Sequence, residues 1–226
     1  MAGTGEIEVT PREEILDRVR KALGRKAGQG RDRVPEPRIR IPEIPPERRV
    51  ALFAERLEAL GGKVYRAAAL AQVRDITAGI LEGSAAVCSM DPLLEKAGIP
   101  GLPGVVSGFG DEPSLRAACA AAPFGITGAD YGLAETGSIV TRSVSEARLI
   151  SLLPPAHIAV LPVSRMLTGL DEFYSELPMP ADAASSTVFI TGPSRSADIE
   201  MILVRGVHGP RVIHVIVVDE EHATNR

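Results

Sequence analysis

Residues 212–218 read VIHVIVV, a run in which every side chain except that of His214 is apolar. A strand with one exposed face alternates apolar and polar residues, whereas a strand buried on both faces is apolar almost throughout. Residues 157–162, HIAVLP, have the same character. The two stretches therefore predict central strands of a parallel sheet that is covered on both faces.

Shorter apolar runs and helical periodicity extend this pattern along the chain. Strands are expected at residues 63–66, 85–90, 105–108, 139–142, 158–161, 187–191 and 212–218. Apolar side chains three or four residues apart predict helices at residues 46–60, 70–80 and 163–177. Strands that alternate with helices form parallel β-α-β units, so we expect an α/β fold whose mostly parallel sheet carries helices on both faces. In such a sheet, ligands bind beyond the carboxyl ends of the strands.

The amino-terminal 46 residues have a different composition from the rest. Thr10, Pro11 and Glu13 are an N-cap, a first-turn proline and an N3 acid, which predict a short helix ending before Gly24. Residues 25–46 then contain five prolines and several arginines, among them Arg31, which disfavour helix and packed strand. We expect an N-terminal helix and Pro/Arg-rich arm over residues 1–46 and an α/β domain over residues 47–226. The arm is either a solvated linker or a strap over this domain or a neighbouring subunit.

Composition narrows the classes of function. The net charge of −4 makes nucleic acid a poor default partner. There is no apolar h-region near the start and no run of about 18 apolar residues, so no membrane span is expected and a cytoplasmic location follows by elimination. Cys88 and Cys119 form no CxxC pair, and the four histidines lack HxH or HExxH spacing. We therefore expect no metal or cofactor to be bound by any recognisable motif.

The first unusual loop is FGITGADYGLAETGSIVTRS, residues 124–143. Its glycines, including Gly128 and Gly137, permit close approach of another molecule to the backbone. A carboxylate beside a strand can act as base, nucleophile or hydrogen-bond acceptor, and Glu135 is the leading catalytic candidate. Asp130 and Thr136 are candidate binding residues. The alternative is that Asp130 and Glu135 only accept backbone N–H groups in a tight turn.

The second unusual loop is TVFITGPSRSADIE, residues 187–200, in which a strand runs into a turn and a helix is expected from near Ser196. Free N–H groups and the positive end of a helix dipole attract a carboxylate or phosphate. The candidate binding residues here are Thr191, Gly192, Ser194, Arg195 and Asp198. The alternative is ordinary capping by Ser194 or Ser196. Without a GK[ST] ending or a GxGxxG pattern, ATP and NAD lose support.

Two further candidates lie between these loops, in RLISLLPPAHIAVLP. Arg148 precedes the apolar run and His157 begins the strand. His157 can donate to a substrate oxygen or can be a structural histidine bonded to the backbone at the strand entrance. We expect the two loops to meet at one edge of the sheet and to form a pocket for an anion.

The segments GITGADYGLAETGSIV, RLISLLPPAHIAVLP, TGPSRSADIE and GVHGP resemble the hallmark segments of the lactate-utilisation protein C family, the LUD-domain proteins. The resemblance spans about residues 124–219. It implies a fold like that of glucosamine-phosphate deaminases, ribose-phosphate isomerases and coenzyme A transferases. It also implies service in the oxidation of L-lactate to pyruvate beside iron-sulfur companion proteins. The site candidates named above carry over as members of the family's motifs.

Two main functions are compatible with the sequence. One is a non-redox, substrate-binding subunit of an L-lactate-oxidising complex, whose partners accept the electrons. The other is an independent enzyme acting on a sugar phosphate or acyl thioester with Glu135 as nucleophile or base. A regulatory module that uses the arginine arm is disfavoured by the acidic chain, and a homo-oligomer is possible.

Overall fold

The computed structural model of the chain describes residues 10–29, 44–143, 148–199, 202–206 and 208–219. The chain divides into two compact units, residues 1–38 and 39–226. In the first unit, α1 (Pro11–Ala22) begins with the predicted capping box, in which Thr10 accepts from the Glu13 backbone N–H and the Glu13 carboxylate accepts from that of Thr10. Its apolar side chains, Ile15, Val19 and Leu23, are exposed.

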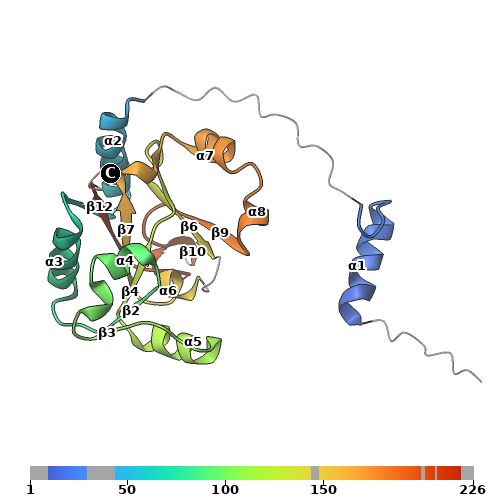
Figure 1. Cartoon of the computed structure of the whole chain (residues 1–226), viewed down its shortest axis with the longest axis horizontal. Helices are drawn as coiled ribbons and strands as arrows, with labels where there is room; N and C mark the ends of the chain where they lie inside the picture. Colours follow the sequence, from blue (N-terminus) through green and yellow to red (C-terminus); the bar gives the residue numbers. More distant parts are fainter. Residues whose placement is uncertain (1–9, 30–43, 144–147, 200–201, 207, 220–226) are drawn as a thin grey trace, which may run out of the picture. The chain divides into compact units, whose positions relative to one another are not determined.

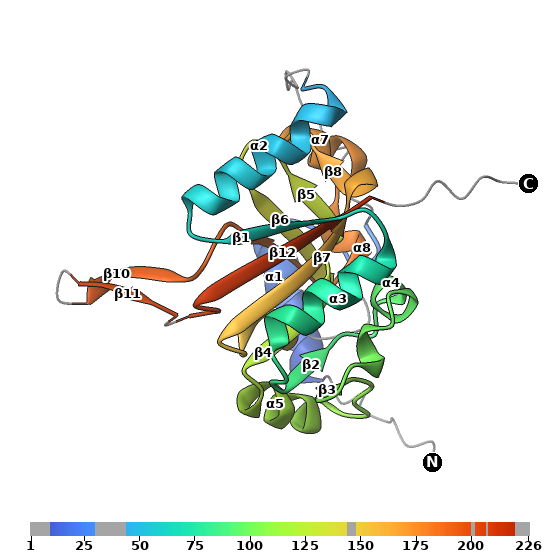
Figure 2. The same ribbon diagram turned by 90° about the vertical axis from the view of Figure 1, so that its left-hand side faces the viewer.

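The second unit is built on a six-stranded parallel sheet, in the order β1-β12-β7-β4-β2-β3. Its strands are β1 (Lys63–Ala67), β2 (Ala86–Cys88), β3 (Val105–Val106), β4 (Phe124–Gly128), β7 (Ala156–Pro162) and β12 (Val212–Val218). Every residue of β7 is buried, and so is every residue of β12 after Val212. The predicted α/β fold with a parallel sheet is confirmed. The two most apolar stretches, β7 and β12, lie side by side in this sheet (Figure 2).

Helices cover the first face of this sheet. α3 (Leu70–Leu81) and α4 (Pro92–Lys96) pack there, and a short 3-10 turn, Ile99–Gly101, follows α4. Val73, Leu81 and Leu94 share a buried cluster with the strand residues Ile126 and Ile158. Figure 1 shows α3 on one side of the main sheet and strands β6 and β9 on the other.

The second face is covered by helices and by a second sheet. α2 (Pro46–Ala59) inserts Phe53 and Leu57 against β7 and β12, and α5 (Glu112–Ala121) and α6 (Leu149–Leu152) cover Val87 of β2. The second sheet has the order β8-β5-β6-β9. It consists of β5 (Tyr131–Leu133), β6 (Ser138–Ser143), β8 (Met166–Leu167) and β9 (Ser186–Ile190), and its outer side packs on Phe173.

Two helix predictions are wrong. The helix expected over residues 163–177 is divided into a 3-10 turn (Val163–Arg165), β8, and α7 (Leu170–Glu176), because β8 pairs with β5 and the extended Gly169 interrupts the helix. A one-turn helix, α8 (Pro180–Ala183), follows.

The helix expected from Ser196 is a strand. β10 (Arg195–Ile199) pairs antiparallel with β11 (Ile202–Arg205). The β-branched Ile202 and Val204 favour a strand, and the partner strand satisfies the backbone groups that a helix would have satisfied internally. Figure 2 shows this hairpin projecting from the body of the domain.

Candidate functional site

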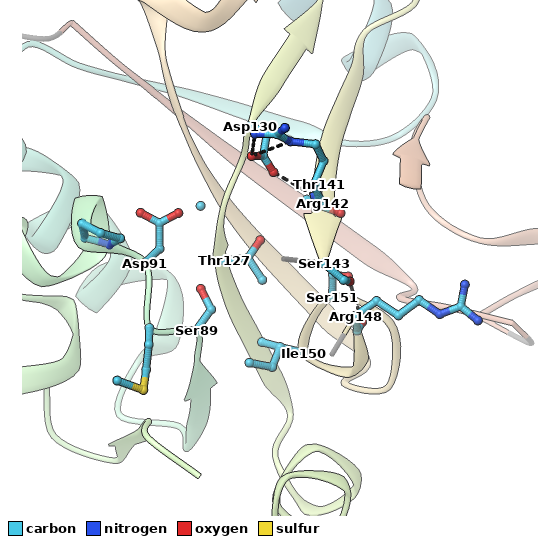
Figure 3. Close-up of a pocket in the computed structure, with 13 residues that line it drawn as sticks. Ser89, Asp91, Thr127, Asp130, Thr141, Arg142, Ser143, Arg148, Ile150 and Ser151 are labelled. Carbon is cyan, nitrogen blue, oxygen red and sulfur yellow. Dashed lines mark hydrogen bonds and ion pairs between the residues drawn. The ribbon is translucent and has the colours of Figure 1, made fainter. Parts of the chain in front are cut away.

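A cavity of about 210 Å³ lies at the carboxyl ends of β2 and β4. Strands of both sheets contribute to it, and hydroxyl, carboxylate and guanidinium groups line it (Figure 3). The lining residues are Ser89, Met90, Asp91, Pro92, Thr127, Gly128, Asp130, Thr141, Arg142, Ser143, Arg148, Ile150 and Ser151.

The topology of the sheet explains why a cavity lies at this position. After β2 the chain turns to the first face, where Leu93 and Leu94 of α4 are buried. After β4 it turns to the opposite face, where Ala129 is buried against Phe53 and Leu57. Neighbouring strands whose chains leave toward opposite faces create a crevice at their carboxyl ends, where α/β proteins commonly bind ligands.

Asp91 forms the β2 side of the cavity. Its Oδ1 accepts from the Leu93 backbone N–H at 2.8 Å and so caps α4. The rest of the carboxylate lies against Gly128, where a β-carbon would overlap it. A glycine at position 128 therefore allows a carboxylate to stand between the ends of β2 and β4.

Asp130 and Arg142 form the side contributed by the second sheet. Asp130 Oδ1 accepts from Arg142 Nε at 3.0 Å and Nη2 at 2.9 Å, and Oδ2 accepts from the Arg142 backbone N–H at 2.8 Å. The Arg142 guanidinium also lies 5.8 Å from the centroid of the Tyr131 ring. Most of the charge of Asp130 is therefore compensated within the protein, chiefly by the Arg142 guanidinium.

Thr127 lines the cavity from β4, and His157 lies behind it on the neighbouring strand β7. The Thr127 hydroxyl is 2.9 Å from His157 Nε2, and His157 is 0% exposed. Burial, with a smaller effect of His214, lowers the pKa of His157 to about 4. His157 is therefore neutral at pH 7 and is bonded to a side chain that faces the cavity, not to the backbone.

Further hydroxyls and one arginine complete the lining. Thr141 and Ser143 come from β6, while Ser151 of α6 donates to the Arg148 carbonyl at 3.1 Å. Arg148 is exposed at the rim, forms no ion pair with the described residues, and in Figure 3 extends away from Asp91 and Thr127. With Asp130 and Arg142 paired, the described residues of the cavity lining offer one carboxylate, several hydroxyls and a positive charge at the rim.

Glu135, Thr136 and Gly137 lie at the other end of the β5–β6 hairpin. The three-residue strand β5, about 10 Å long at roughly 3.3 Å per residue, lies between Asp130 and Glu135 in the chain. The Glu135 side chain is exposed and contacts Gly169, and its backbone N–H donates to the Thr168 carbonyl at 2.9 Å. Gly137 has φ +65°, and a β-carbon there would overlap the backbone of α2. This turn is packed tightly and does not line the cavity.

The two loops meet at this turn and not at the cavity. Ser138 Oγ is 2.7 Å from Thr136 Oγ1 and 2.6 Å from Thr191 Oγ1. Farther along, the Ser194 backbone N–H donates to the carbonyl of Pro210, which precedes the amino end of β12. Because that end is opposite the carboxyl ends of the strands, residues 191–194 do not share the cavity with Asp130. The expectation of one pocket formed by both loops is corrected in this respect, while the side chains of Arg195 and Asp198 lie outside the described part of the structure.

Most of the polar lining was not predicted from the sequence. Ser89, Asp91, Thr127 and Arg142 each occupy or follow a strand end, and Gly128, Asp130 and Arg148 are the three binding candidates that the cavity does bring together. A search for polar residues directly after each predicted strand would have found Asp91, which follows the expected strand at 85–90.

The described residues contain neither a cluster of metal ligands nor a membrane-spanning helix. No three His, Cys, Asp or Glu side chains in this part of the chain are grouped as a metal site would need. Among the same residues, no helix has the length and apolar character required to cross a bilayer.

A family model and several curated proteins match this chain. Residues 50–218 match the family model of the LUD domain. "Lactate utilization protein C" of Halalkalibacterium halodurans is 45% identical over 104 residues, which cover 43% of this chain and 45% of that protein. The protein of the same name from Bacillus subtilis is 42% identical over 101 residues, 42% of each chain. The chain thus spans about half the length of the curated relatives it matches.

The fold also matches a solved structure. The crystal structure of a duf162 family protein from Deinococcus radiodurans aligns with a TM-score of 0.59 and 21% sequence identity. The alignment covers 78% of this chain and 99% of that one. At this level of identity, the match shows a shared fold.

Proposed function

The chain belongs to the LUD domain family, and from this premise we propose that it serves in the utilisation of L-lactate. In this proposal it binds a small hydroxy carboxylate in the cavity between β2 and β4, within a system that oxidises L-lactate to pyruvate. The relatives named lactate utilization protein C support the pathway. The chemistry of the cavity supports the class of ligand.

The proposal rests on one observation, which is that the Asp91 carboxylate and several hydroxyl groups line the same small cavity. A 2-hydroxy acid has a hydroxyl that donates and a carboxylate that accepts. The hydroxyl suits the part of the Asp91 carboxylate that is not engaged in capping α4. The carboxylate suits the hydroxyls of Thr127, Thr141 and Ser143, with Arg148 supplying positive charge at the rim.

The electrons are proposed to leave through other proteins. Oxidation of L-lactate to pyruvate releases two electrons and two protons, so an acceptor is required. Cys88 and Cys119 are both buried, and the described residues group no metal ligands. Following the resemblance to the lactate-utilisation proteins, we assign electron acceptance to iron-sulfur companion proteins in the cytoplasm and substrate binding to this chain. The alternative, an independent enzyme with Glu135 as nucleophile or base, gains no support from the cavity because Glu135 does not line it.

Calorimetric titration tests the proposal. L-Lactate, pyruvate and propionate are titrated into the purified chain, because propionate lacks the 2-hydroxyl and pyruvate replaces it with an acceptor. We expect L-lactate to bind best, by about tenfold over propionate, the worth of one hydrogen bond to a charged group. Equal binding of all three, or no binding, would contradict the proposal.

The decisive variant is Asp91→Asn. The amide oxygen keeps the cap of α4, while the amide nitrogen replaces a carboxylate acceptor with a donor. The preference for L-lactate over pyruvate should therefore disappear. Asp111→Asn is the matched control, because Asp111 caps α5 through a 2.7 Å bond from the Ser114 N–H and does not line the cavity.

A further inference from the structure

The Thr127–His157 contact has an unusual feature on the side away from the cavity. His157 Nε2 is paired with the Thr127 hydroxyl at 2.9 Å, whereas Nδ1 is buried and has no hydrogen-bond partner within the described part of the chain. A neutral imidazole carries one N–H and one lone pair, so one of these two groups must occupy Nδ1. Which group occupies Nδ1 decides which atom donates in the bond to Thr127.

Burial distinguishes the two tautomers. Buried N–H groups without a partner are rarer in native proteins than buried acceptors that lack one. The tautomer with a lone pair at Nδ1 and the hydrogen on Nε2 is therefore favoured. The ring is neutral at pH 7 because burial lowers the pKa of His157 to about 4. Nε2–H then donates to Thr127 Oγ1.

The neighbouring groups do not favour the opposite arrangement. In serine-type catalytic triads a carboxylate holds the Nδ1–H, and the imidazole accepts the hydroxyl proton of the nucleophile. No carboxylate in the described residues is bonded to His157, and the other buried imidazole, His214, is paired with the Tyr65 hydroxyl at 3.0 Å. Nothing in this arrangement turns Thr127 into an activated nucleophile.

We infer that His157 donates to Thr127 and thereby directs the Thr127 hydroxyl proton into the cavity, where it donates to a carboxylate oxygen of the ligand. Thr127 is then a specificity-determining residue for the carboxylate, and His157 is a positioning residue that acts through it. Asp91 recognises the ligand hydroxyl on the other side. The inference rests on the proposed function, because it assumes that a small carboxylate occupies this cavity.

The tautomer can be tested without any ligand. In protein with ¹⁵N-labelled histidine, we expect a pyrrole-type chemical shift for Nε2 and a pyridine-type shift for Nδ1 of His157 at pH 7. His157→Gln identifies the resonances. A protonated Nδ1 with a pyridine-type Nε2 would overturn the inference.

Binding of propionate tests the role of Thr127. Propionate presents a carboxylate but no hydroxyl, so it isolates this contact from that of Asp91. Thr127→Val should weaken propionate binding by about tenfold, while Thr127→Ser should retain most of it. His157→Leu should weaken binding through Thr127, and His157→Gln, whose amide N–H can replace Nε2–H, should restore part of the loss.

The outcomes separate the two proposals. Full propionate affinity in Thr127→Val would overturn the inference about Thr127. The cavity would still be the binding site if Asp91→Asn altered the preference for L-lactate over pyruvate. Failure of the unmodified chain to bind any carboxylate would overturn both. Because the tautomer is read in the unmodified chain, the inference stays testable even where His157→Leu fails to fold.

Discussion

The carboxylate of Asp91 occupies the space in which a β-carbon on Gly128 would lie. These two residues follow or end neighbouring strands, so their contact forms one wall of the cavity at the carboxyl edge of the sheet. Gly128 has no positive φ in the structure. The need for glycine at this position is therefore one of space.

Gly128→Ala should displace the Asp91 carboxylate. We expect a loss of about 1–3 kcal/mol in the free energy of unfolding, as for other insertions into packed sites, together with weaker binding of L-lactate. Urea unfolding and calorimetry measure the two effects. Gly79→Ala is the control, because nothing lies within 4 Å of a β-carbon at that helical position, and it should stabilise the protein by about 0.5–1 kcal/mol. Unchanged stability and binding in Gly128→Ala would refute the contact.

Arg142→Met should destabilise the β5–β6 hairpin. The side chains of Arg142 and Asp130 are only 22% and 26% exposed, so removing the guanidinium leaves a poorly solvated carboxylate. We expect a loss of about 1–3 kcal/mol in urea unfolding. Arg116→Met, which removes an exposed pair with Glu112 on α5, should cost at most about 0.5 kcal/mol. Equal effects of the two substitutions would show that the Asp130 pair is no stronger than a surface pair.

Stability should fall as the pH drops from about 6.5 to about 4. Burial lowers the pKa of both His157 and His214 to about 4, whereas the unfolded chain has ordinary histidines near 6.5. In this window the unfolded state binds more protons, so the stability is fully present above 6.5 and is lost on acidification. For the fully buried His157 the loss is about 3 kcal/mol.

Urea unfolding at several pH values checks this dependence. His157→Gln removes one of the two buried titrating rings, so it should flatten the slope between pH 6.5 and pH 4. A slope that stays unchanged in this variant would show that His157 is not the group that titrates.

Glu135→Gln should leave the affinity for L-lactate unchanged. Glu135 is exposed at the hairpin turn, and β5 separates it from Asp130. Calorimetry on this variant beside Asp91→Asn makes the comparison under identical conditions. Loss of binding or of turnover in Glu135→Gln alone would instead favour the independent-enzyme alternative and move the site to the turn.

The sequence predicted the fold where the signal is long and local. β12 and β7 are seven residues long, each with a single histidine among apolar residues, and such runs are typical of strands buried on both faces. β5 and β8, with three and two residues, were not predicted as strands because they are too short for any periodicity to be read. The strand at residues 195–199 was predicted as a helix because Ser and Asp after a Gly-Pro turn are typical of helix caps. The strand forms because it pairs with β11, which comes later in the chain.

The candidate site was only partly predictable for a related reason. Asp91 faces Gly128 and Thr127 because β4 lies beside β2, although β3 comes between them in the chain. Strand order of this kind is set by non-local packing and leaves no local pattern in the sequence. Asp130 and Gly128 were found because glycines and a carboxylate lie close together in one loop. Ser89 and Asp91 come from a different strand end and carry no such signal.

A crystal structure of the chain with bound L-lactate would show directly whether the cavity beside Asp91 and Thr127 holds the ligand. We expect the ligand between Asp91 and Thr127, with its 2-hydroxyl toward the Asp91 carboxylate and its carboxylate accepting from the Thr127 hydroxyl. L-Lactate bound instead at the turn formed by Glu135 and Gly169, with the cavity unoccupied, would contradict this expectation.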